Sequence, residues 1–122
     1  MNEYIENAQI TDTFLGIEDH GIFTFSIMLD YGSSGQGFGH YSLDGYNKEL
    51  KKREGWANGI MVLRGILEAV GVDSWEKLKG RYVRVKRVGE HEFSAMVRAI
   101  GHPIKDKWMD VREFSVASND DD

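Results

Sequence analysis

The densest group of chemically active side chains is a basic segment in the second half of the chain. Six cations fall within eleven residues, namely Lys77, Lys79, Arg81, Arg84, Lys86 and Arg87. Tyr82 lies among them and Trp75 lies just before them. Cations with interleaved aromatic rings suit a nucleotide, because the charges contact phosphates while the flat rings stack on bases. The same pattern is also typical of a solvated strand edge, where Lys and Arg discourage aggregation.

A glycine-rich stretch between Gly32 and Gly39 is the second candidate. Four glycines in eight residues exclude a regular helix, and such a stretch either connects strands or presents backbone N–H groups to a phosphate. The stretch has neither the dinucleotide-binding glycine fingerprint nor the Gly-Lys-Ser/Thr of a P-loop. Gln36, Phe38 and His40 lie within it or next to it and are candidates for contacting a base.

The third candidate is the segment from Gly101 to Trp108, which combines His102, Lys105 and Lys107 with an aromatic ring. Loops near the end of a chain carry function more often than their length suggests. The alternative is a surface turn that is anchored by a buried Trp108.

The sequence offers no pattern for catalysis or for a metal. The four histidines are scattered without ligand spacing and cysteine is absent, so neither a zinc site nor a thiol nucleophile is expected. Ser33 and Ser34 lack the context of a nucleophile elbow. We therefore expect no metal, no cofactor and no enzymatic activity.

The first half of the chain is expected to form strands that position these segments. Residues 4–12 suit a first strand, and residues 22–31 alternate apolar and polar side chains with a period of two. Gly21 suits a hairpin turn between them, because glycine adopts a positive φ without strain. A short strand is expected over residues 38–43 and an exposed loop over residues 44–56.

The second half is expected to contain one long helix followed by a hairpin. Residues 57–70 place Ile60, Leu63, Ile66, Leu67 and Val70 on one apolar face, and Gly71 suits the left-handed cap at the end of such a helix. A short helix is expected over residues 75–78. Residues 81–88 and 92–100 suit a β-hairpin, after which an irregular segment runs to Phe114. The fold class is therefore α+β, with an antiparallel sheet packed on one long central helix plus a short helix.

Length and charge limit the organisation of the chain. The 122 residues suit one α+β domain over residues 1–117, with a disordered acidic tail over residues 118–122. No run approaches the roughly 20 apolar residues of a membrane span, and the polar start resembles no signal peptide, so a cytoplasmic protein is expected. The net charge of −5 divides into −7 up to Asn47, +6 over residues 48–112 and −4 beyond. A nucleic-acid partner is not expected, because such proteins carry a larger positive excess.

Three blocks of the chain resemble a known family. They are Leu15 to Ile22 with Leu29 to Gly39, then Gly71 to Val85, and finally Ala99 to Trp108. Together these blocks are spread from Leu15 to Trp108, over most of the length of the chain. In them the sequence resembles small phage and prophage proteins, most closely the first-described Thoeris anti-defence proteins.

That resemblance implies a function and a mode of binding. Members of the family sequester the cyclic ADP-ribose signal made by TIR-domain immune enzymes and do not cleave it. The resemblance thus implies a phage-encoded protein acting in the host bacterial cytoplasm, as a homodimer or higher homo-oligomer. Its ligand would carry a pyrophosphate and an adenine.

The residues of this chain offer groups for such a ligand. Cations that suit the pyrophosphate are Arg84, Lys86, Lys105 and Lys107. Rings that suit the base are Tyr82, Phe38 and Trp108, and side chains that suit its polar edge are Gln36, His40 and His102. Tyr82 is the first choice for stacking, because it begins the basic strand.

A second function of a different class remains open. A small acidic protein can also inhibit a host defence complex by mimicking nucleic acid, with the acidic first 47 residues in place of phosphates. A nucleotide-binding protein should bind a small nucleotide with no host protein present. A mimic should bind a basic protein, and salt should weaken that binding strongly.

Overall fold

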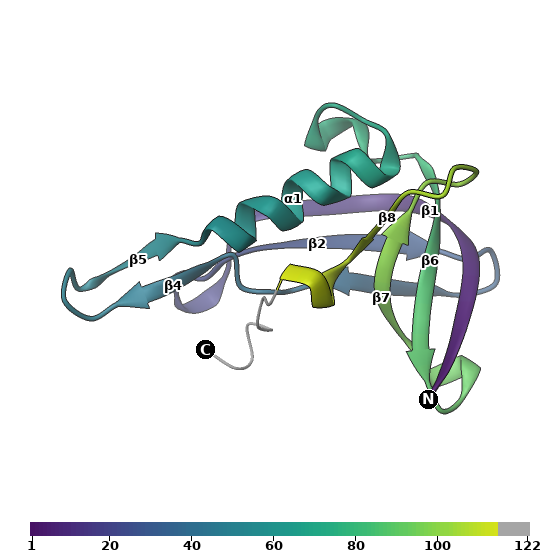
Figure 1. Cartoon of the computed structure of the whole chain (residues 1–122), viewed down its shortest axis with the longest axis horizontal. Helices are drawn as coiled ribbons and strands as arrows, with labels where there is room; N and C mark the ends of the chain where they lie inside the picture. The colour runs from purple at the N-terminus through teal and green to yellow at the C-terminus, as the bar shows by residue number, and fades with distance from the viewer. Residues whose placement is uncertain (115–122) are drawn as a thin grey trace.

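The structure is a computed structural model, and it describes residues 1–114. Eight strands and one α-helix form an α+β fold with antiparallel strand pairing, which confirms the expected fold class (Figure 1). The strands are β1 (Asn2–Ile17), β2 (Phe23–Asp30), β3 (Gly35–Gly39), β4 (Asp44–Asn47), β5 (Lys52–Gly55), β6 (Tyr82–Gly89), β7 (Met96–Gly101) and β8 (Trp108–Asp110), and the helix is α1 (Ala57–Val70). The tail over residues 118–122, expected to be disordered, lies outside the described residues.

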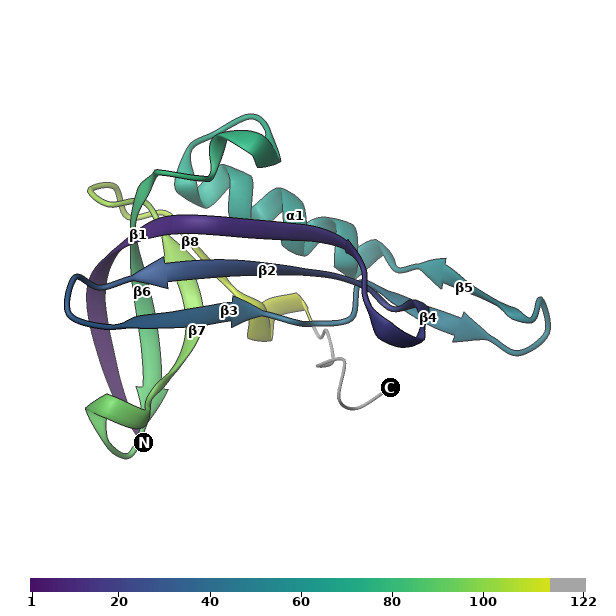
Figure 2. The same ribbon diagram turned by 180° about the vertical axis from the view of Figure 1, so that it is seen from behind.

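The main sheet has the strand order β3-β2-β1-β6-β7-β8. Its longest strand, β1, pairs with β6 through Asn2–Gln9 and with β2 through Gln9–Ile17. A bulge between Ile10 and Asp12 lies near the change of partner, and bulges bend a strand and increase its twist. Figure 2 shows the result, in which the second half of β1, together with β2 and β3, runs across the direction of β6 and β7.

The long strand β1 was only partly expected, since the sequence indicated residues 4–12. The turn after it was expected correctly. Gly21 has a φ of 76° and His20 a φ of 68°, within the 3₁₀ turn Asp19–Gly21 that joins β1 to β2. The glycine-rich stretch proves to be an edge strand for most of its length. Its residues from Gly35 to Gly39 pair with β2, so only Gly32, Ser33 and Ser34 form a turn.

The expectation of an exposed loop over residues 44–56 is wrong. This stretch forms a two-stranded hairpin, β4–β5, that projects beyond the start of α1 (Figure 1). A partly buried ion pair explains the order at its base, because Arg53 Nη2 lies 2.8 Å from Asp44 Oδ1. The indole of Trp56 also covers Gly45 so closely that a Cβ there would come within 2.3 Å of the ring. The sequence pattern did not show this pairing.

Helix α1 has the bounds that the sequence predicted, and Gly71 caps it with a φ of 91°. Its buried face, however, consists of Gly59, Val62, Ile66, Ala69 and Val70. Ile60 was expected to be buried and is 60% exposed. The helix packs on β7, β8 and the 3₁₀ turn Val111–Phe114, which shifts its buried face away from Ile60.

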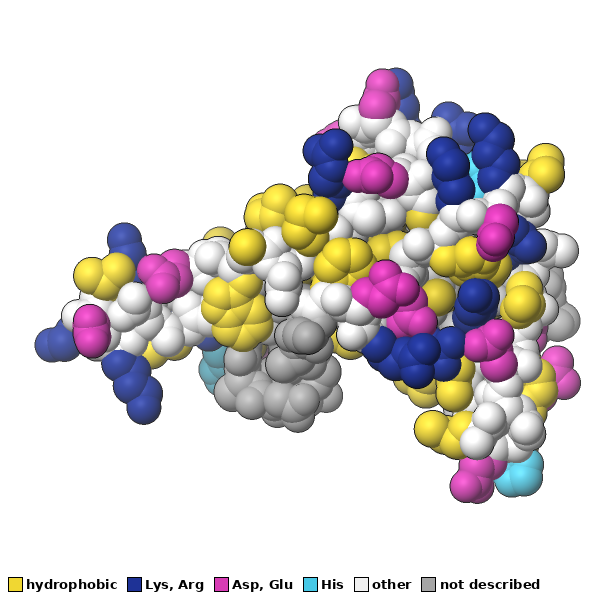
Figure 3. Space-filling model, in the orientation of Figure 1, with side chains coloured by type: hydrophobic (Ala, Val, Ile, Leu, Met, Phe, Trp, Pro, Cys, Tyr) yellow, Lys and Arg dark blue, Asp and Glu magenta, His cyan; other side chains and the backbone are white. Residues whose placement is uncertain are grey.

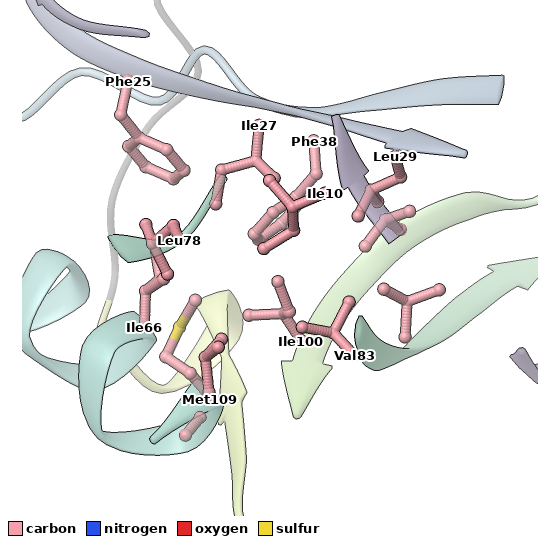
Figure 4. Packing of buried hydrophobic residues seen from close by; sticks show 14 of the residues in the cluster. Ile10, Phe25, Ile27, Leu29, Phe38, Ile66, Leu78, Val83, Ile100 and Met109 are labelled. Carbon is pink, nitrogen blue, oxygen red and sulfur yellow. The ribbon is translucent and has the colours of Figure 1, made fainter. Parts of the chain in front are cut away.

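The core lies between α1 and the concave side of the main sheet. Figure 4 shows Ile66 of α1 and Leu78 facing Ile10, Phe25 and Ile27 from the first half of the chain, with Val83, Ile100 and Met109 completing the cluster. The expected short helix is a 3₁₀ turn, Trp75–Lys77. A further 3₁₀ turn, Glu92–Ser94, joins β6 to β7. Because Val83 of β6 and Ile100 of β7 belong to the core, the core fixes the positions of both strands and of the loop after β7.

Candidate functional site

Strand β6 sends alternate side chains to opposite faces of the sheet. Val83 and Val85 are fully buried, whereas Tyr82, Arg84 and Lys86 lie on the other face. This is the alternation that the sequence predicted, and it follows from the two-residue period of a strand. Because the apolar residues are fixed in the core, the three polar residues form a row on the outer face.

Trp108 of β8 lies across this outer face. It pairs with Gly101 of β7, and a Cβ at Gly101 would come within 2.6 Å of the indole. The absence of that carbon lets the ring approach β6, where Lys86 Nζ lies 4.3 Å and the Arg84 guanidinium carbon 5.0 Å from the ring centroid. Cations are attracted to the face of an indole at such distances. Trp108 is half-buried and holds two cations of its own chain.

Arg84 also fixes the β7–β8 loop, residues 102–107. Its Nε donates a hydrogen bond to the carbonyl of His102 at 2.9 Å, and its Nη2 donates to the carbonyl of Lys105 at 2.8 Å. The backbone N–H of His102 donates to the carbonyl of Lys107 at 3.0 Å. The loop is therefore closed on itself and attached to β6, while the side chains of Lys105 and Lys107 stay exposed.

His102 has a defined role inside this loop. Its Nδ1 accepts hydrogen bonds from the backbone N–H groups of Ile104, at 3.1 Å, and Lys105, at 2.9 Å. Desolvation and the neighbouring charges of Lys105, Lys107 and Arg84 lower the pKa of His102. With Nδ1 accepting, the proton of the neutral ring is carried by Nε2, which makes Nε2–H a donor that the loop bonds leave free.

The site is strongly basic. Among residues 1–114, none of Arg84, Lys86, Lys105 and Lys107 has a carboxylate within ion-pair distance. Figure 3 shows dark-blue Lys and Arg side chains gathered at the end of the molecule where Figure 1 places the β7–β8 loop. Four cations without a carboxylate partner on one small surface favour an anion with more than one charge.

A hollow of about 550 Å³ opens beside these cations, between the connection from α1 to β6 and the β7–β8 loop. It is lined by Val70, Gly71, Lys79, Gly80, Arg81, Tyr82, His102 and Pro103. Tyr82 is 65% exposed, so its ring is accessible for stacking. Lys79 and Arg81 belong to the basic segment singled out in the sequence, but were not among the expected site residues. Gly71 and Gly80, both at positive φ, shape a wall that no sequence motif indicated.

The structure brings together seven of the ten residues that the sequence offered as candidates. Tyr82 and His102 line the hollow, and Arg84, Lys86, Lys105, Lys107 and Trp108 form the basic surface beside it. They come from two segments about twenty residues apart, which the pairing of β6 with β7 and of β7 with β8 brings together.

The other three expected residues lie elsewhere. Phe38 is 2% exposed and packs edge-on against Phe25 in the core, so the expectation that it stacks on a base is wrong. His40 follows β3 with its Nδ1 3.6 Å from a carboxylate oxygen of Glu18. Gln36 is hydrogen-bonded to the carbonyl of Ala95 at 2.9 Å. All three belong to β3 or its end. This strand meets β7 at Met96, the end of β7 opposite to Gly101 and Trp108.

Arg87 belongs to the basic segment of the sequence but does not face the candidate site. The two-residue alternation of β6 places its side chain on the same inward face as Val83 and Val85, where its Nη1 lies 2.6 Å from Glu6 Oε1 and its Nη2 donates to the carbonyl of Glu92. Its guanidinium also lies over the ring of Tyr31, at 5.2 Å, and burial raises the pKa of that tyrosine to about 12. Arg87 therefore links β6 to Glu6 of β1 and to Tyr31, the residue directly after β2, and serves the fold.

Comparisons with known proteins assign no family. No protein-family model matches the chain, and no match was found among curated proteins or solved structures. In residues 1–114, no helix has the length and apolar character needed to cross a membrane. The same part of the chain holds no group of three or more His, Asp or Glu side chains arranged to bind a metal ion. The function must be inferred from the site itself.

Proposed function

We propose that the protein binds a cyclic ADP-ribose-type nucleotide and sequesters it without cleaving it. The observation that supports this most directly is a group of four cations, without a carboxylate partner among residues 1–114, next to a hollow lined by Tyr82 and His102. Lys105, Lys107, Lys86 and Arg84 supply charge for a pyrophosphate. Tyr82 supplies a face for the adenine, and His102 supplies a donor for an acceptor atom of the ligand.

This proposal includes the biological role implied by the resemblance noted in the sequence. A protein that holds an immune nucleotide intact lowers its free concentration and so prevents signalling. The proposed role is therefore that of a phage- or prophage-encoded anti-defence protein that acts in the cytoplasm of the bacterial host.

A homo-oligomer is part of the same proposal. Apolar side chains stay exposed around the start of α1 and the β4–β5 hairpin, namely Tyr46, Leu50, Trp56, Ile60 and Met61, and Figure 3 shows yellow surface over these elements. A lone two-stranded hairpin has marginal stability in water. A second copy of the chain that covers this surface would stabilise both the hairpin and the exposed helix face.

The distribution of charge weighs against the nucleic-acid mimic. Of the seven acids before Lys48, four lie within ion-pair distance of Lys or Arg from the basic half of the chain. They are Glu3 with Arg98, Glu6 with Arg87, Asp12 with Lys79, and Asp44 with Arg53. The acidic first segment therefore packs against basic residues of its own chain, and these acids do not form a separate negative face.

A thermal-shift screen tests the proposed function. The melting temperature of the purified protein is measured with cyclic ADP-ribose isomers and with cyclic di- and trinucleotides. Each stabilising compound is then released by heat, and its mass is measured by mass spectrometry. A ligand at 100 times its Kd should stabilise the protein by about 2.7 kcal/mol and be recovered intact. An altered mass would indicate a hydrolase instead. No shift with any nucleotide would reject the proposal and leave the protein–protein inhibitor to be tested.

Tyr82→Ala tests the position of the ligand. If the base stacks on this ring, affinity should fall by about 1–3 kcal/mol, measured by calorimetric titration with the compound found in the screen. Phe93→Ala is the control, because Phe93 is also an exposed aromatic residue (88%) but lies in the turn Glu92–Ser94, outside both the hollow and the proposed oligomer surface. Equal affinity of the Tyr82→Ala variant and the unaltered protein would remove Tyr82 from the site.

A further inference from the structure

A second hollow, of about 490 Å³, lies between α1 and the segment from Asp106 to Phe114. Met61, Gly65, Trp108, Met109 and Phe114 contribute to its lining. At Gly65 the side chains of Met109 and Phe114 lie against the helix, since a Cβ there would lie 2.8 Å and 3.6 Å from them. One helical turn and a half further on, Gly71 faces His102. The groove therefore runs along α1 from Phe114 towards the β7–β8 loop.

The character of the groove changes along its course. Near Phe114 it is apolar, with Met61 of α1 and Met109 of β8 on its walls. Near the loop it includes Lys107, and Lys105 and Lys86 are close by through the loop hydrogen bonds and the ring of Trp108. Acids also line it, but Glu68 is paired with Arg64 at 2.7 Å and Asp106 accepts a hydrogen bond from Trp108 Nε1.

The chain that continues from Phe114 has the same order of properties. Eight residues follow in the sequence, Ser-Val-Ala-Ser-Asn-Asp-Asp-Asp, with Val116 and Ala117 first and three aspartates last. Eight extended residues span up to about 26 Å, whereas the six residues of α1 from Gly65 to Val70 rise only about 9 Å. The segment is long enough to follow the groove from Phe114 to the lysines.

We propose that the groove between α1 and β8 is the docking surface for residues 115–122 of the same chain. Val116 and Ala117 lie against the apolar part of the groove, and Asp120, Asp121 and Asp122 lie against Lys105 and Lys107. The lysines, which have no carboxylate partner among residues 1–114, are matched in this way by the acids at the end of the chain. A consequence that rests on the proposed nucleotide function is that an anionic ligand competes with this segment for the same lysines.

A spin label tests the docking in the absence of any nucleotide. The chain has no cysteine, so Ser118→Cys provides a single attachment site for a nitroxide, and the broadening of amide signals is read by NMR. Broadening of Lys107, Trp108 and Gly65, with sharp signals for the distant β4–β5 hairpin, is the expected result. Uniform broadening, or none at these three residues, would overturn the proposal.

The matched control carries the same label on a neutralised segment, Asp120→Asn, Asp121→Asn and Asp122→Asn. The charge argument predicts weaker broadening of Lys107 in this variant, and also in the unneutralised labelled chain at high salt, because exposed ion pairs are screened. Identical broadening in both chains would show that the aspartates do not contact the lysines. None of these outcomes depends on whether a cyclic nucleotide binds.

Inorganic pyrophosphate tests the competition. The three asparagine substitutions should tighten its binding several-fold and by no more than about tenfold, since each exposed ion pair contributes little. Unchanged affinity together with the expected NMR result would refute the competition but not the docking. Docking without binding of any cyclic nucleotide would instead reject the proposed function and leave this proposal standing.

Discussion

Single residues decide the shape of the basic surface, and Gly101 is the first of them. The indole of Trp108 occupies the space where any other residue would have its Cβ, 2.6 Å from Trp108 Cε3 and 2.7 Å from the carbonyl of Lys107. The ring in turn holds Lys86 and Arg84. A methyl group at position 101 must therefore move the ring away from β6 and separate it from both cations.

Gly101→Ala should lower the free energy of unfolding by about 1–3 kcal/mol, as other overpacking substitutions do, measured by urea denaturation. Gly55→Ala is the control, because a Cβ at Gly55 meets nothing within 4 Å and its backbone is not in the left-handed region. If the two variants were equally stable, the close approach of Trp108 to Gly101 would be incorrect.

His102 makes the β7–β8 loop sensitive to pH. Its pKa is lowered by desolvation and by Lys105, Lys107 and Arg84, so the folded protein favours the neutral ring. A group with a lowered pKa in the folded state contributes stability that is present above its ordinary pKa, near 6.5, and is lost as pH falls below that value. Protonation also removes the acceptor for Ile104 and Lys105 N–H.

The melting temperature should therefore respond to pH through this residue. The difference between the unaltered protein and His102→Gln should shrink as pH is lowered from about 7.5 to about 5, because only the unaltered protein loses the contribution of the neutral imidazole. Scanning calorimetry of the two proteins at matched pH measures it. A difference that is constant with pH would show that the Nδ1 contacts do not stabilise the loop.

At the scale of elements, α1 shows how packing selects one face of a helix that is apolar on several sides. Ile66 is fully buried whereas Ile60 is 60% exposed, although both were expected on the buried face. The helix lies against β7, β8 and the turn Val111–Phe114, and a long apolar sequence alone does not indicate which side these elements cover.

Ile66→Ala should lower the free energy of unfolding by about 2–5 kcal/mol, because it removes buried volume and leaves a cavity. Ile104→Ala is the control for the same change of side chain at an 84% exposed position, where surface substitutions change stability by about 0.5 kcal/mol or less. Both are measured by urea denaturation. A loss below about 1 kcal/mol for Ile66→Ala would mean that α1 does not pack on the sheet through this face.

At the scale of the whole molecule, the chain separates two kinds of surface. The basic site lies at the β7–β8 loop, and the exposed apolar side chains lie around the β4–β5 hairpin and the start of α1 (Figures 1 and 3). Apolar exposure of several neighbouring large side chains is typical of a protein interface. The proposed oligomer is therefore expected to form through the hairpin and α1, away from Tyr82.

Ile60→Lys should convert the proposed oligomer to a monomer, because the new charge would be placed in the interface without a partner. Sedimentation velocity of the unaltered and substituted chains measures the change, with Ile104→Lys as the control at an exposed isoleucine outside this surface. A monomer in the unaltered protein would reject the oligomer. An unchanged oligomer in Ile60→Lys would place the interface elsewhere.

The sequence by itself determined the elements whose signals are local. The two-residue period of β2 and β6 identified their buried faces, and the bounds of α1 followed from its apolar run and from Gly71, whose positive φ ends the helix. The row of Tyr82, Arg84 and Lys86 on one face of β6 likewise follows from strand geometry alone. These features depend on neighbours within a few residues.

Only the tertiary structure decided which of the chemically active residues meet. Strand pairing placed Gly101 and Trp108 beside Arg84 and left Gln36 and His40 on an edge strand. Strand alternation turned Arg87 inward, but the pairing of β1 with β6 gave it Glu6 as a partner, eighty-one positions away in the sequence. The hairpin over residues 44–55 depends on the Asp44–Arg53 ion pair and on Trp56. Each of these contacts depends on which strands pair and in what register. A local pattern of polar and apolar residues does not contain that information.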